Sequence, residues 1–258
     1  MSDASPTAPP PTPPAPQATP MLDQQYTELA ELAGGFIHEI KNHLSTLGLN
    51  LQLLAEDFEN PETQRERRAL ERIQRLQGEC QRLVDVSNDF LRFARVKDLD
   101  LRPTDLAGVV EELVIFFGPT AMTDNIDIKS YFPSDLPPVR LDREMFKQAL
   151  LNLLLNAQQA MSGGGEITIQ ASRDNDDVVL NVIDTGKGMP PDVAAKVFRP
   201  FYSTRTGGSG LGLPTTRKII EAHGGSIDLQ SEVGRGTKFT IRLPAAHSAD
   251  GAAESREA

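Results

Sequence analysis

The sequence predicts an α+β protein in which a long antiparallel helical hairpin, forming a four-helix bundle in a dimer, precedes an α/β sandwich. Three observations support this prediction. Apolar residues recur at alternating steps of three and four over residues 21–96, which contain a single proline. After residue 97, short β-rich runs alternate with helical patterns. Residues 186–210 are rich in glycine and interrupted by proline, a pattern more typical of a lid or binding loop than of a plain connection.

Composition limits the function classes. The 258 residues carry a formal charge of −10, which gives no electrostatic support for binding nucleic acid or an acidic membrane surface. The single cysteine, Cys80, excludes an intramolecular disulfide and is compatible with a reducing compartment. No run reaches the ~18–20 apolar residues of a membrane span, and the first residues lack the pattern of a signal peptide. We therefore expect a cytoplasmic protein.

The composition at the two ends of the chain predicts tails that do not fold. Residues 1–20 hold eight of the 19 prolines and almost nothing that could pack, so we expect a disordered or polyproline-like segment. Its P-x-x-P spacings could dock an SH3-like partner, although a solubilising leader is the simpler interpretation. Residues 245–258 are small and polar and predict a second tail. The helical hairpin is then expected over 21–97 and the second domain over 98–244.

Two stripes define the hairpin. The first runs through Leu29, Ala33, Phe36, Ile40, Leu44, Leu47, Leu51, Leu54 and Phe58, and the second through Leu70, Ile73, Leu76, Cys80, Leu83, Ser87, Phe90 and Ala94. Between them, Asn60-Pro61-Glu62 predicts a helix start with Asn60 as the N-cap. Two helices of ~35 residues would each be ~50 Å long. An isolated pair of that length buries one thin seam, which favours a homodimer.

The first helix carries a polar group that could do chemistry. His38 lies two residues past Phe36, about 200° around the helix from the seam, so we expect it to face outward. Glu39 could hold one imidazole N–H and leave the other nitrogen as a nucleophile, and Asn42 could position a water or a phosphoryl oxygen. A solvated surface histidine is the alternative. His43 lies at the edge of the seam and is expected to be packed.

The second domain alternates strands and helices. Strands are expected at Ile126–Phe132, Glu166–Ser172, Asp177–Ile183, Ser226–Ser231 and Thr237–Leu243, and helices at Leu106–Phe117, Arg143–Met161 and Leu211–His223. This order suggests one sheet covered by helices on one face.

Four features of this domain converge on a nucleotide. Asn152 and Asn156 stack at i and i+4 on an otherwise apolar helical stretch, and buried carboxamides need partners. Residues 182–189 read as a strand ending in an acid, followed by glycines that let the backbone approach a flat ligand. An aromatic cluster at 197–202 could anchor the loop. The glycine string at 207–212 runs into a helix start, which suits phosphate.

These motifs resemble the sensor histidine kinases of two-component systems. FIHEIKN resembles the phospho-acceptor box, NLLLNA the N box, DTGKGM the first glycine box, FRPFYST the F box, GGSGLGL the second glycine box and GRGTKF the last. The resemblance covers Leu29 to Pro244, and the boxes stand in the family's order. It implies a Bergerat-type ATP-binding fold, shared with the gyrase, chaperone and mismatch-repair ATPases.

The resemblance also implies roles for individual residues. The catalytic group would be His38, Glu39 and Asn42, and the ATP-binding group would be Asn152, Asn156, Asp184, Gly186, Gly188, Arg205, Gly208, Gly210, Leu211, Gly212 and Thr237. Asp184 would bind the adenine amino group, Asn156 would hold Mg²⁺, and Arg205 would lie near the γ-phosphate. Relatives that hydrolyse ATP usually have glutamate in place of Asn152; an asparagine cannot be that base, which suits transfer to histidine.

The implied activity is that of an ATP-dependent protein-histidine kinase (EC 2.7.13.3). It would phosphorylate itself on His38, pass the phosphoryl group to an aspartate of a response regulator receiver domain, and dephosphorylate that regulator through Asn42. The segment Lys97–Leu101 would be the hinge between the domains. One alternative is a nucleotide-regulated phosphatase or scaffold with little autokinase activity. Another is a serine kinase or stand-alone ATPase of the same superfamily.

The sequence departs from the family at two points. His43 stands where the family commonly has proline, so signal-linked bending of the first helix would be weaker or lie elsewhere. No sensor domain precedes the hairpin, so input would come from an upstream sensor protein or from a region outside this sequence. The phrase GLGLPTTRKIIEAHGG resembles the soluble kinases that serve enhancer-dependent regulators.

Overall fold

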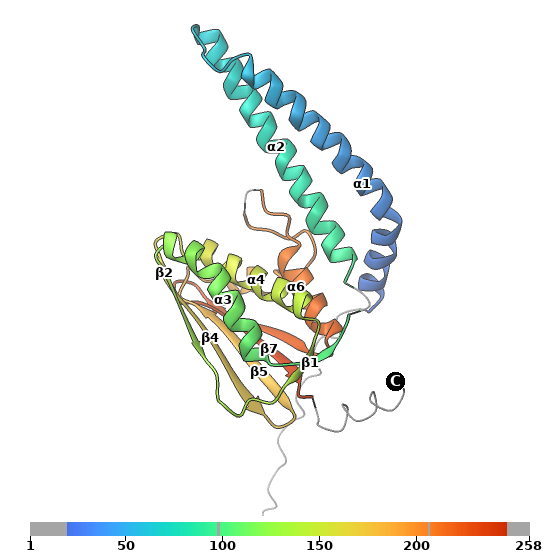
Figure 1. Cartoon of the computed structure of the whole chain (residues 1–258), viewed down its shortest axis with the longest axis vertical. Coiled ribbons are helices and arrows are strands. Elements are labelled where there is room, and N and C mark those ends of the chain that lie inside the picture. The colour runs from blue at the N-terminus through green and yellow to red at the C-terminus, as the bar shows by residue number, and fades with distance from the viewer. Residues whose placement is uncertain (1–19, 97–98, 206, 247–258) are drawn as a thin grey trace, which may run out of the picture.

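A computed structural model describes residues 20–96, 99–205 and 207–246, with the side chains of 20–36 and 38 left aside. A helical hairpin leads into a sheet domain whose helices lie on one face of the sheet (Figure 1). The predicted α+β class is therefore confirmed. The two predicted tails fall almost entirely outside the described residues, so their disorder stays a prediction.

The hairpin consists of α1 (Pro20–Glu56) and α2 (Gln64–Ala94). Asn60 was expected to cap α2, and this is wrong, because the N-cap is Thr63. The Thr63 hydroxyl accepts a hydrogen bond from the Glu66 amide at 3.2 Å, and the Glu66 carboxylate accepts one from the Thr63 amide at 3.0 Å. This reciprocal capping box satisfies two helix-end donors, whereas Asn60-Pro61 could offer only one.

The seam between α1 and α2 buries few side chains. Ile73 and Cys80 of α2 are buried against α1, while four leucines spaced seven apart within their helices remain about half exposed: Leu47, Leu54, Leu76 and Leu83. His43, expected to pack at the edge of the seam, is exposed.

The sheet domain contains one five-stranded sheet in the order β2-β4-β5-β7-β6. The strands are β2 (Ile126–Tyr131), β4 (Gly165–Asp174), β5 (Asp177–Asp184), β6 (Ser226–Glu232) and β7 (Gly236–Pro244). β2 pairs parallel with β4, and the other pairs are antiparallel. All five lie where the sequence predicts strands. A separate pair, β1 (Arg102–Thr104) with β3 (Val139–Leu141), was not predicted, because three residues show no periodicity.

Three helices cover one face of this sheet: α3 (Leu106–Thr123), α4 (Arg143–Ala160) and α6 (Gly212–Ala222). The one-turn α5 (Pro191–Ala194) lies in the glycine-rich stretch. α3 was expected to end at Phe117 but continues through Pro119. The hydrogen bond that the proline removes would be accepted by Ile115, which is on the solvent side of the helix.

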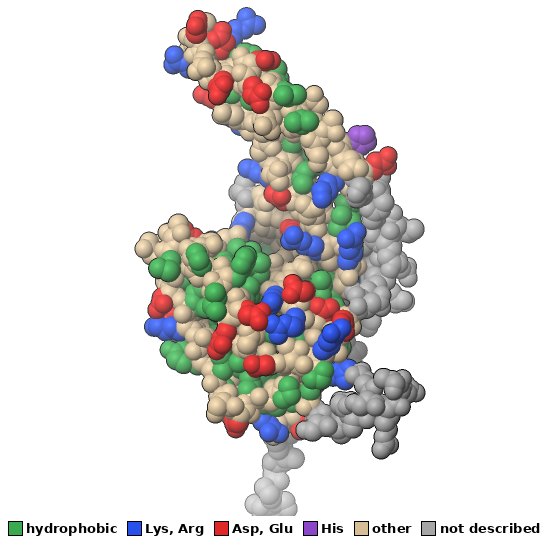
Figure 2. All heavy atoms as spheres, in the orientation of Figure 1, with side chains coloured by type: hydrophobic (Ala, Val, Ile, Leu, Met, Phe, Trp, Pro, Cys, Tyr) green, Lys and Arg blue, Asp and Glu red, His purple; other side chains and the backbone are tan. Residues whose placement is uncertain are grey.

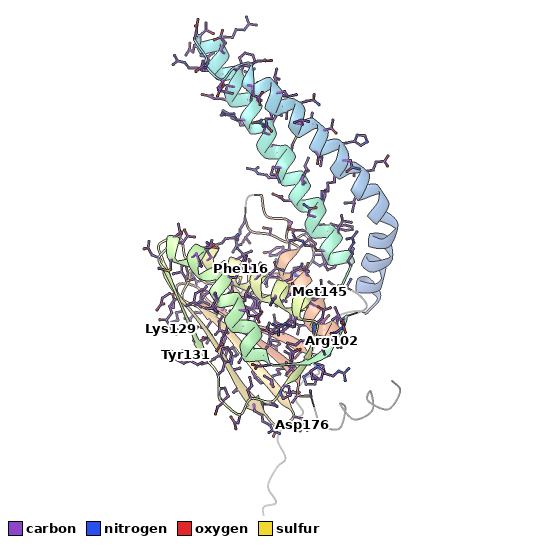
Figure 3. The ribbon with its side chains drawn as sticks, in the orientation of Figure 1. Arg102, Phe116, Lys129, Tyr131, Met145 and Asp176 are labelled. Carbon is purple, nitrogen blue, oxygen red and sulfur yellow. The ribbon has the colours of Figure 1, made fainter. Side chains whose placement is uncertain are left out.

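α3 is also long and apolar enough to cross a membrane by length and composition, and it is the one such helix among the described residues. Its inner face packs into the core of the domain through Leu106, Val109, Val110, Leu113, Phe117 and Ala121. Its outer face exposes Phe116, and Tyr131 of the neighbouring β2 is exposed as well (Figure 3). The buried face is that of a core helix.

The end of α2 is built into the sheet domain. Val96 is buried in that domain's core, and the Lys218 ammonium of α6 donates to the Phe93 carbonyl at 3.1 Å. The expected hinge begins at residues 97–98, which lie outside the described residues. From Asp100 onward the chain is bonded to the sheet domain, since the Asp100 amide donates to the Asp142 carboxylate at 3.3 Å.

At the other end, the described chain remains attached to the sheet domain to residue 246. The Ala245 amide donates to the Asp176 carbonyl at 2.8 Å, and the Ala246 amide donates to the Pro138 carbonyl at 2.8 Å. On the face seen in Figure 2, acidic and basic side chains are intermixed over both the hairpin and the sheet domain.

Candidate nucleotide site

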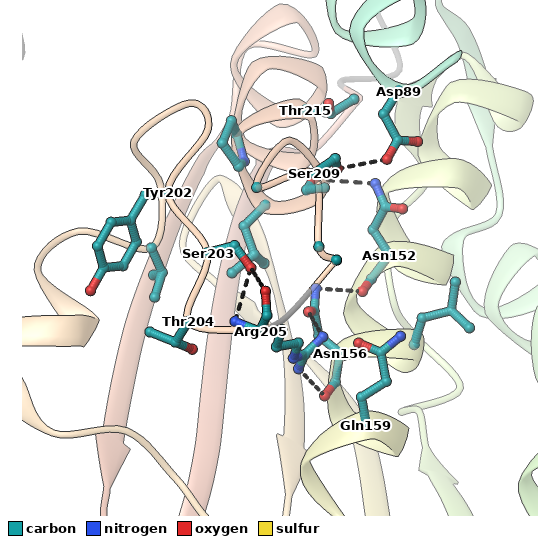
Figure 4. A pocket seen from close by; sticks show the side chains of 18 of the residues that line it. Asp89, Asn152, Asn156, Gln159, Tyr202, Ser203, Thr204, Arg205, Ser209 and Thr215 are labelled. Carbon is teal, nitrogen blue, oxygen red and sulfur yellow. Dashed lines mark hydrogen bonds between the residues drawn. The ribbon is translucent and has the colours of Figure 1, made fainter. Parts of the chain in front are cut away.

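A cavity of about 490 Å³ lies where α4, α6 and the loop 201–210 meet the end of α2 (Figure 4). Its walls include Asp89 and Arg92 of α2; Gln148, Asn152, Asn156 and Gln159 of α4; Tyr202, Arg205, Gly208 and Gly210 of the loop; and Gly212 and Thr215 of α6. The cavity therefore gathers six of the expected site residues: Asn152, Asn156, Arg205, Gly208, Gly210 and Gly212.

The two asparagines of α4 have different partners. The Asn152 amide nitrogen donates to the Gly212 carbonyl at 3.2 Å and approaches the Thr216 hydroxyl at 3.5 Å, which ties α4 to the first turn of α6. The Asn156 amide nitrogen donates to the Asn152 carbonyl at 2.8 Å. That bond fixes the Asn156 carboxamide and leaves its oxygen as the acceptor on the cavity side.

The start of α6 is suited to an anion. No side chain caps this helix, so the first-turn amides of Gly212 and Leu213 depend on a ligand or solvent for partners. Gly210 precedes it with φ +67°, and a Cβ there would meet the Phe201 carbonyl carbon at 2.6 Å. The loop can close on itself at this point only with glycine. Leu211 is fully buried and anchors the helix start without lining the cavity.

Arg205 is one of two arginines that line the cavity, the other being Arg92 of α2. The Arg205 guanidinium donates to the Asn156 side-chain oxygen at 3.0 Å and to the Asn156 carbonyl at 3.3 Å. Burial lowers the pKa of Arg205 from its ordinary value. Arginine nevertheless stays charged in proteins, so the cavity contains a partly desolvated positive charge.

A second cluster lies on the sheet, outside the cavity walls, and contains Asp184, Gly186, Gly188 and Thr237. Asp184 Oδ1 accepts from the Gly186 amide at 2.9 Å and from the Thr237 amide at 3.2 Å. The other oxygen, Oδ2, has no hydrogen bond within the described residues and is not enclosed, so it is open to a donor. Gly188 has φ +63°, and a Cβ there would strike the Glu232 carbonyl oxygen at 2.0 Å.

Met189 connects the cluster to the cavity. It lines the cavity, and its amide donates at 2.9 Å to the Ser231 hydroxyl, which is 3.0 Å from the Thr237 hydroxyl. Burial raises the pKa of Asp184 above its ordinary value, while the amides of Gly186 and Thr237 oppose the shift. The result is a buried carboxyl held in place by two backbone donors, with one oxygen left for a ligand.

The candidate catalytic residues of α1 lie apart from this site. Glu39 and Asn42 are exposed, and none of the described residues that line the cavity belongs to α1. The side chain of His38 lies outside the described part, so its outward direction stays a prediction. α2 packs against α6 in this arrangement.

Sequence reasoning missed several cavity residues. Gln148 and Gln159 line the cavity from α4, and with Asn152 and Asn156 they form a polar row at steps of four, four and three. That helical spacing was a readable signal. Asp89 and Arg92 carried no such signal, because their place beside the loop depends on how the hairpin sits on the sheet domain.

The residues fit a magnesium nucleotide. The open Asp184 oxygen can accept the amino group of adenine, and the uncapped α6 start can bind phosphate. The Asn156 oxygen already accepts bonds from a cation, and amide oxygens are ligands that Mg²⁺ takes. The described residues contain no cluster of three or more His, Cys, Asp or Glu side chains that could hold a metal. The phosphates would therefore supply most of the metal's non-water ligands.

Comparison with known families assigns residues 141–247 to the histidine kinase-, DNA gyrase B- and HSP90-like ATPases. Among curated proteins, the chain is 32% identical over 222 residues to the signal transduction histidine-protein kinase AtoS of Escherichia coli, covering 86% of this chain and 36% of AtoS. It is also 32% identical to the sensor histidine kinase ZraS of Escherichia coli, covering 86% of this chain and 46% of ZraS. The chain thus spans between about a third and a half of these relatives.

The solved structures that this chain resembles are also histidine kinases. The full-length histidine kinase ShkA in complex with AMPPNP aligns with a TM-score of 0.66 and 30% identity, covering 84% of this chain and 46% of ShkA. The catalytic domain of histidine kinase ThkA aligns with a TM-score of 0.52 and 31% identity, covering 57% of this chain and 97% of that domain.

Proposed function

Because the chain belongs to the two-component histidine kinase family, we propose that it is an ATP-dependent kinase that phosphorylates its own His38. The observation that carries this proposal is the cavity in which Asn156 and Arg205 face an uncapped helix start behind a glycine loop. Asp184 supports ATP as the substrate, because its open oxygen can accept the adenine amino group.

The proposed reaction is an in-line phosphoryl transfer. An imidazole nitrogen of His38 forms a bond to the γ-phosphorus while the bond from that phosphorus to the β–γ bridging oxygen breaks, which leaves ADP. Glu39 holds the other imidazole N–H and so favours the nucleophilic tautomer. Arg205 and the first amides of α6 stabilise charge on the transferred group. Asn156 would hold Mg²⁺, which neutralises phosphate charge when bound.

This reaction requires the domains to move. The cavity faces α2, whereas His38 is on α1. In-line attack needs the reacting atoms about 3–3.5 Å apart. The sheet domain therefore has to leave its contacts with α2 before transfer, and the segment after Val96 is the place for that rotation.

The proposal includes a dimer and a second protein substrate. The exposed leucines of the hairpin (Leu47, Leu54, Leu76 and Leu83) suit a second copy of the chain, since they would be buried in a four-helix bundle. The phosphoryl group would pass from His38 to an aspartate of a response regulator. Asn42, one turn from His38, would position water to dephosphorylate that regulator. An upstream sensor protein would supply the input, and the single cysteine suits the cytoplasm.

The proposal is tested by incubating the purified chain with γ-labelled ATP and Mg²⁺, alongside His38→Ala and the matched control His43→Ala. We expect an acid-labile, base-stable label that disappears only in His38→Ala. An acid-stable label would indicate a serine kinase. Bound ATP without any label would favour a nucleotide-regulated phosphatase or scaffold.

A further inference from the structure

Asn156 and Arg205 form a paired contact that matters for metal binding. The guanidinium contacts both oxygens of Asn156, at 3.0 Å for the side chain and 3.3 Å for the backbone. The Asn156 amide nitrogen is already used, because it donates to the Asn152 carbonyl at 2.8 Å. The carboxamide is therefore held with its oxygen toward a positive charge (Figure 4).

That oxygen is the same atom expected to hold Mg²⁺. Mg²⁺ binds oxygen ligands at about 2.0–2.1 Å in an octahedral shell that also contains phosphate oxygens and water. A guanidinium in hydrogen-bond contact with the same carboxamide oxygen would intrude on this shell and repel the metal. Arg205 and the metal therefore exclude one another at Asn156.

The cavity offers Arg205 few other partners. Asp89 is the one acidic side chain among the described residues that line it, and Asp89 already accepts a hydrogen bond from Ser209 at 2.7 Å. The backbone of Arg205 is fixed by the Ser203 hydroxyl, which is 3.1 Å from its amide nitrogen and 3.3 Å from its carbonyl oxygen. A displaced guanidinium would swing about its own side-chain bonds and meet the charge brought by the nucleotide.

We propose that Arg205 competes with Mg²⁺ for the Asn156 side-chain oxygen, and that the terminal phosphate of ATP resolves the competition by taking the displaced guanidinium. This inference rests on the proposed nucleotide site. It adds that Arg205 weakens Mg²⁺ binding when the bound nucleotide is a diphosphate and strengthens nucleotide binding when it is a triphosphate. Arg205 thereby sets the preference for ATP over ADP.

The test measures binding to the full chain by calorimetry, so no turnover is needed. ADP and AMPPNP are titrated at a series of Mg²⁺ concentrations into the wild-type chain, Arg205→Ala, Arg205→Lys and the matched control Arg199→Gln. Arg199 is an exposed arginine six residues before Arg205 and does not line the cavity. Thermal melting of each variant confirms that it folds.

We expect effects of opposite sign in Arg205→Ala. The Mg²⁺ concentration that half-saturates the ADP complex should fall about threefold or more, because the competing cation is gone. Affinity for AMPPNP at saturating Mg²⁺ should fall about tenfold or more, because a charged hydrogen bond to phosphate is lost. Arg205→Lys should stay closer to wild type on both measures. The control Arg199→Gln should match the wild-type chain on both.

Two results would overturn the inference. If Arg205→Ala leaves the Mg²⁺ dependence of ADP binding unchanged, the two cations do not compete. If both ligands weaken in parallel, Arg205 has only a structural role. Failure of the wild-type chain to bind either nucleotide at any Mg²⁺ concentration would refute the nucleotide site itself.

Discussion

The Ser209 hydroxyl donates a hydrogen bond to Asp89 Oδ2 at 2.7 Å, which fastens the glycine loop to the last turns of α2. A second contact lies beside it, where the rings of Phe90 and Phe201 stack with centroids 6.2 Å apart. Phe201 has φ +62°, a conformation that a bulky side chain rarely adopts. The loop is therefore held against the hairpin by a charged hydrogen bond and by a strained aromatic residue.

We predict that Asp89→Asn and Ser209→Ala each speed autophosphorylation several-fold, because either change loosens the loop from α2 and eases the domain movement. The rate of label incorporation from γ-labelled ATP measures the effect. Glu71→Gln is the control, since Glu71 pairs with Arg75 on the same helix at 4.0 Å and does not line the cavity. A slower rate in both variants would show that the contact assists transfer.

The free energy of the hydrogen bond between Asp89 and Ser209 can be measured with a double-mutant cycle. Asp89→Ala, Ser209→Ala and the double variant are compared by urea unfolding of the full chain. A partly buried bond to a carboxylate predicts a coupling free energy of about 1 kcal/mol. A coupling near zero would mean that the bond does not hold the loop in solution.

Asp184 predicts how nucleotide affinity depends on pH. Burial raises the folded-state pKa of Asp184, so in the absence of ligand the protonated carboxyl favours folding and the ionised one opposes it. The stability that the protonated form contributes is full below the ordinary pKa of aspartate and is lost as pH rises through the raised pKa. Binding of the adenine amino group needs the ionised carboxylate. AMPPNP affinity should therefore weaken on acidification from a pH above the usual range for aspartate.

The variant Asp184→Asn separates the effect of Asp184 on folding from its effect on adenine binding. Its oxygen can still accept from the Gly186 and Thr237 amides, so we expect a folded protein. Its amide nitrogen is a donor and would oppose the adenine amino group, so AMPPNP affinity should fall about 100-fold or more. Near-wild-type affinity in this variant, measured by calorimetry, would show that the carboxylate does not contact the base.

Asn42 predicts a division of labour on α1. Asn42→Ala should leave phosphorylation of His38 within about twofold of wild type and should abolish dephosphorylation of the phosphorylated regulator. Asn50→Ala is the matched control, because Asn50 is an exposed asparagine two turns along the same helix. Loss of both activities in Asn42→Ala would contradict separate roles.

The exposed leucines of the hairpin predict its oligomeric state. Leu54→Gln combined with Leu76→Gln should weaken dimerisation by at least about tenfold, because burying each leucine is worth about 1.5–3 kcal/mol. Sedimentation equilibrium measures the change. Ile115→Gln on α3 is the control, since that side chain is also exposed but lies on the sheet domain. Unchanged association of the double leucine variant would place the dimer interface elsewhere.

The predicted features that agree with the structure depend on local pattern. Short β-rich runs located all five strands of the main sheet, and the glycine string placed the start of α6 within a residue. One local signal was misleading. Asn60-Pro61 predicted the start of α2, whereas the reciprocal bonds at the start of that helix are made by Thr63 and Glu66.

Features that depend on how the two domains pack together could not be predicted from the sequence. Asp89 and Arg92 enter the cavity because α2 rests on α6, a relation between domains that no periodicity encodes. The exposure of His43 was not predicted, because a heptad count only approximates which side chains of a long helix face the seam. Gln148 and Gln159 could have been found, since they continue the polar row of the two asparagines.

The burial of Phe93 and Val96 at the junction sets a free-energy cost for separating the sheet domain from the end of the hairpin. Exposing both side chains fully would cost about 3–6 kcal/mol, which corresponds to about two to four orders of magnitude in the ratio of docked to released domains. In the proposed kinase, an input signal would have to supply this free energy before the catalytic domain is released. Replacing either side chain with one that is smaller by one or two carbons would lower the cost by about 1 kcal/mol, so we expect these two positions to set how large a stimulus is needed for a given response.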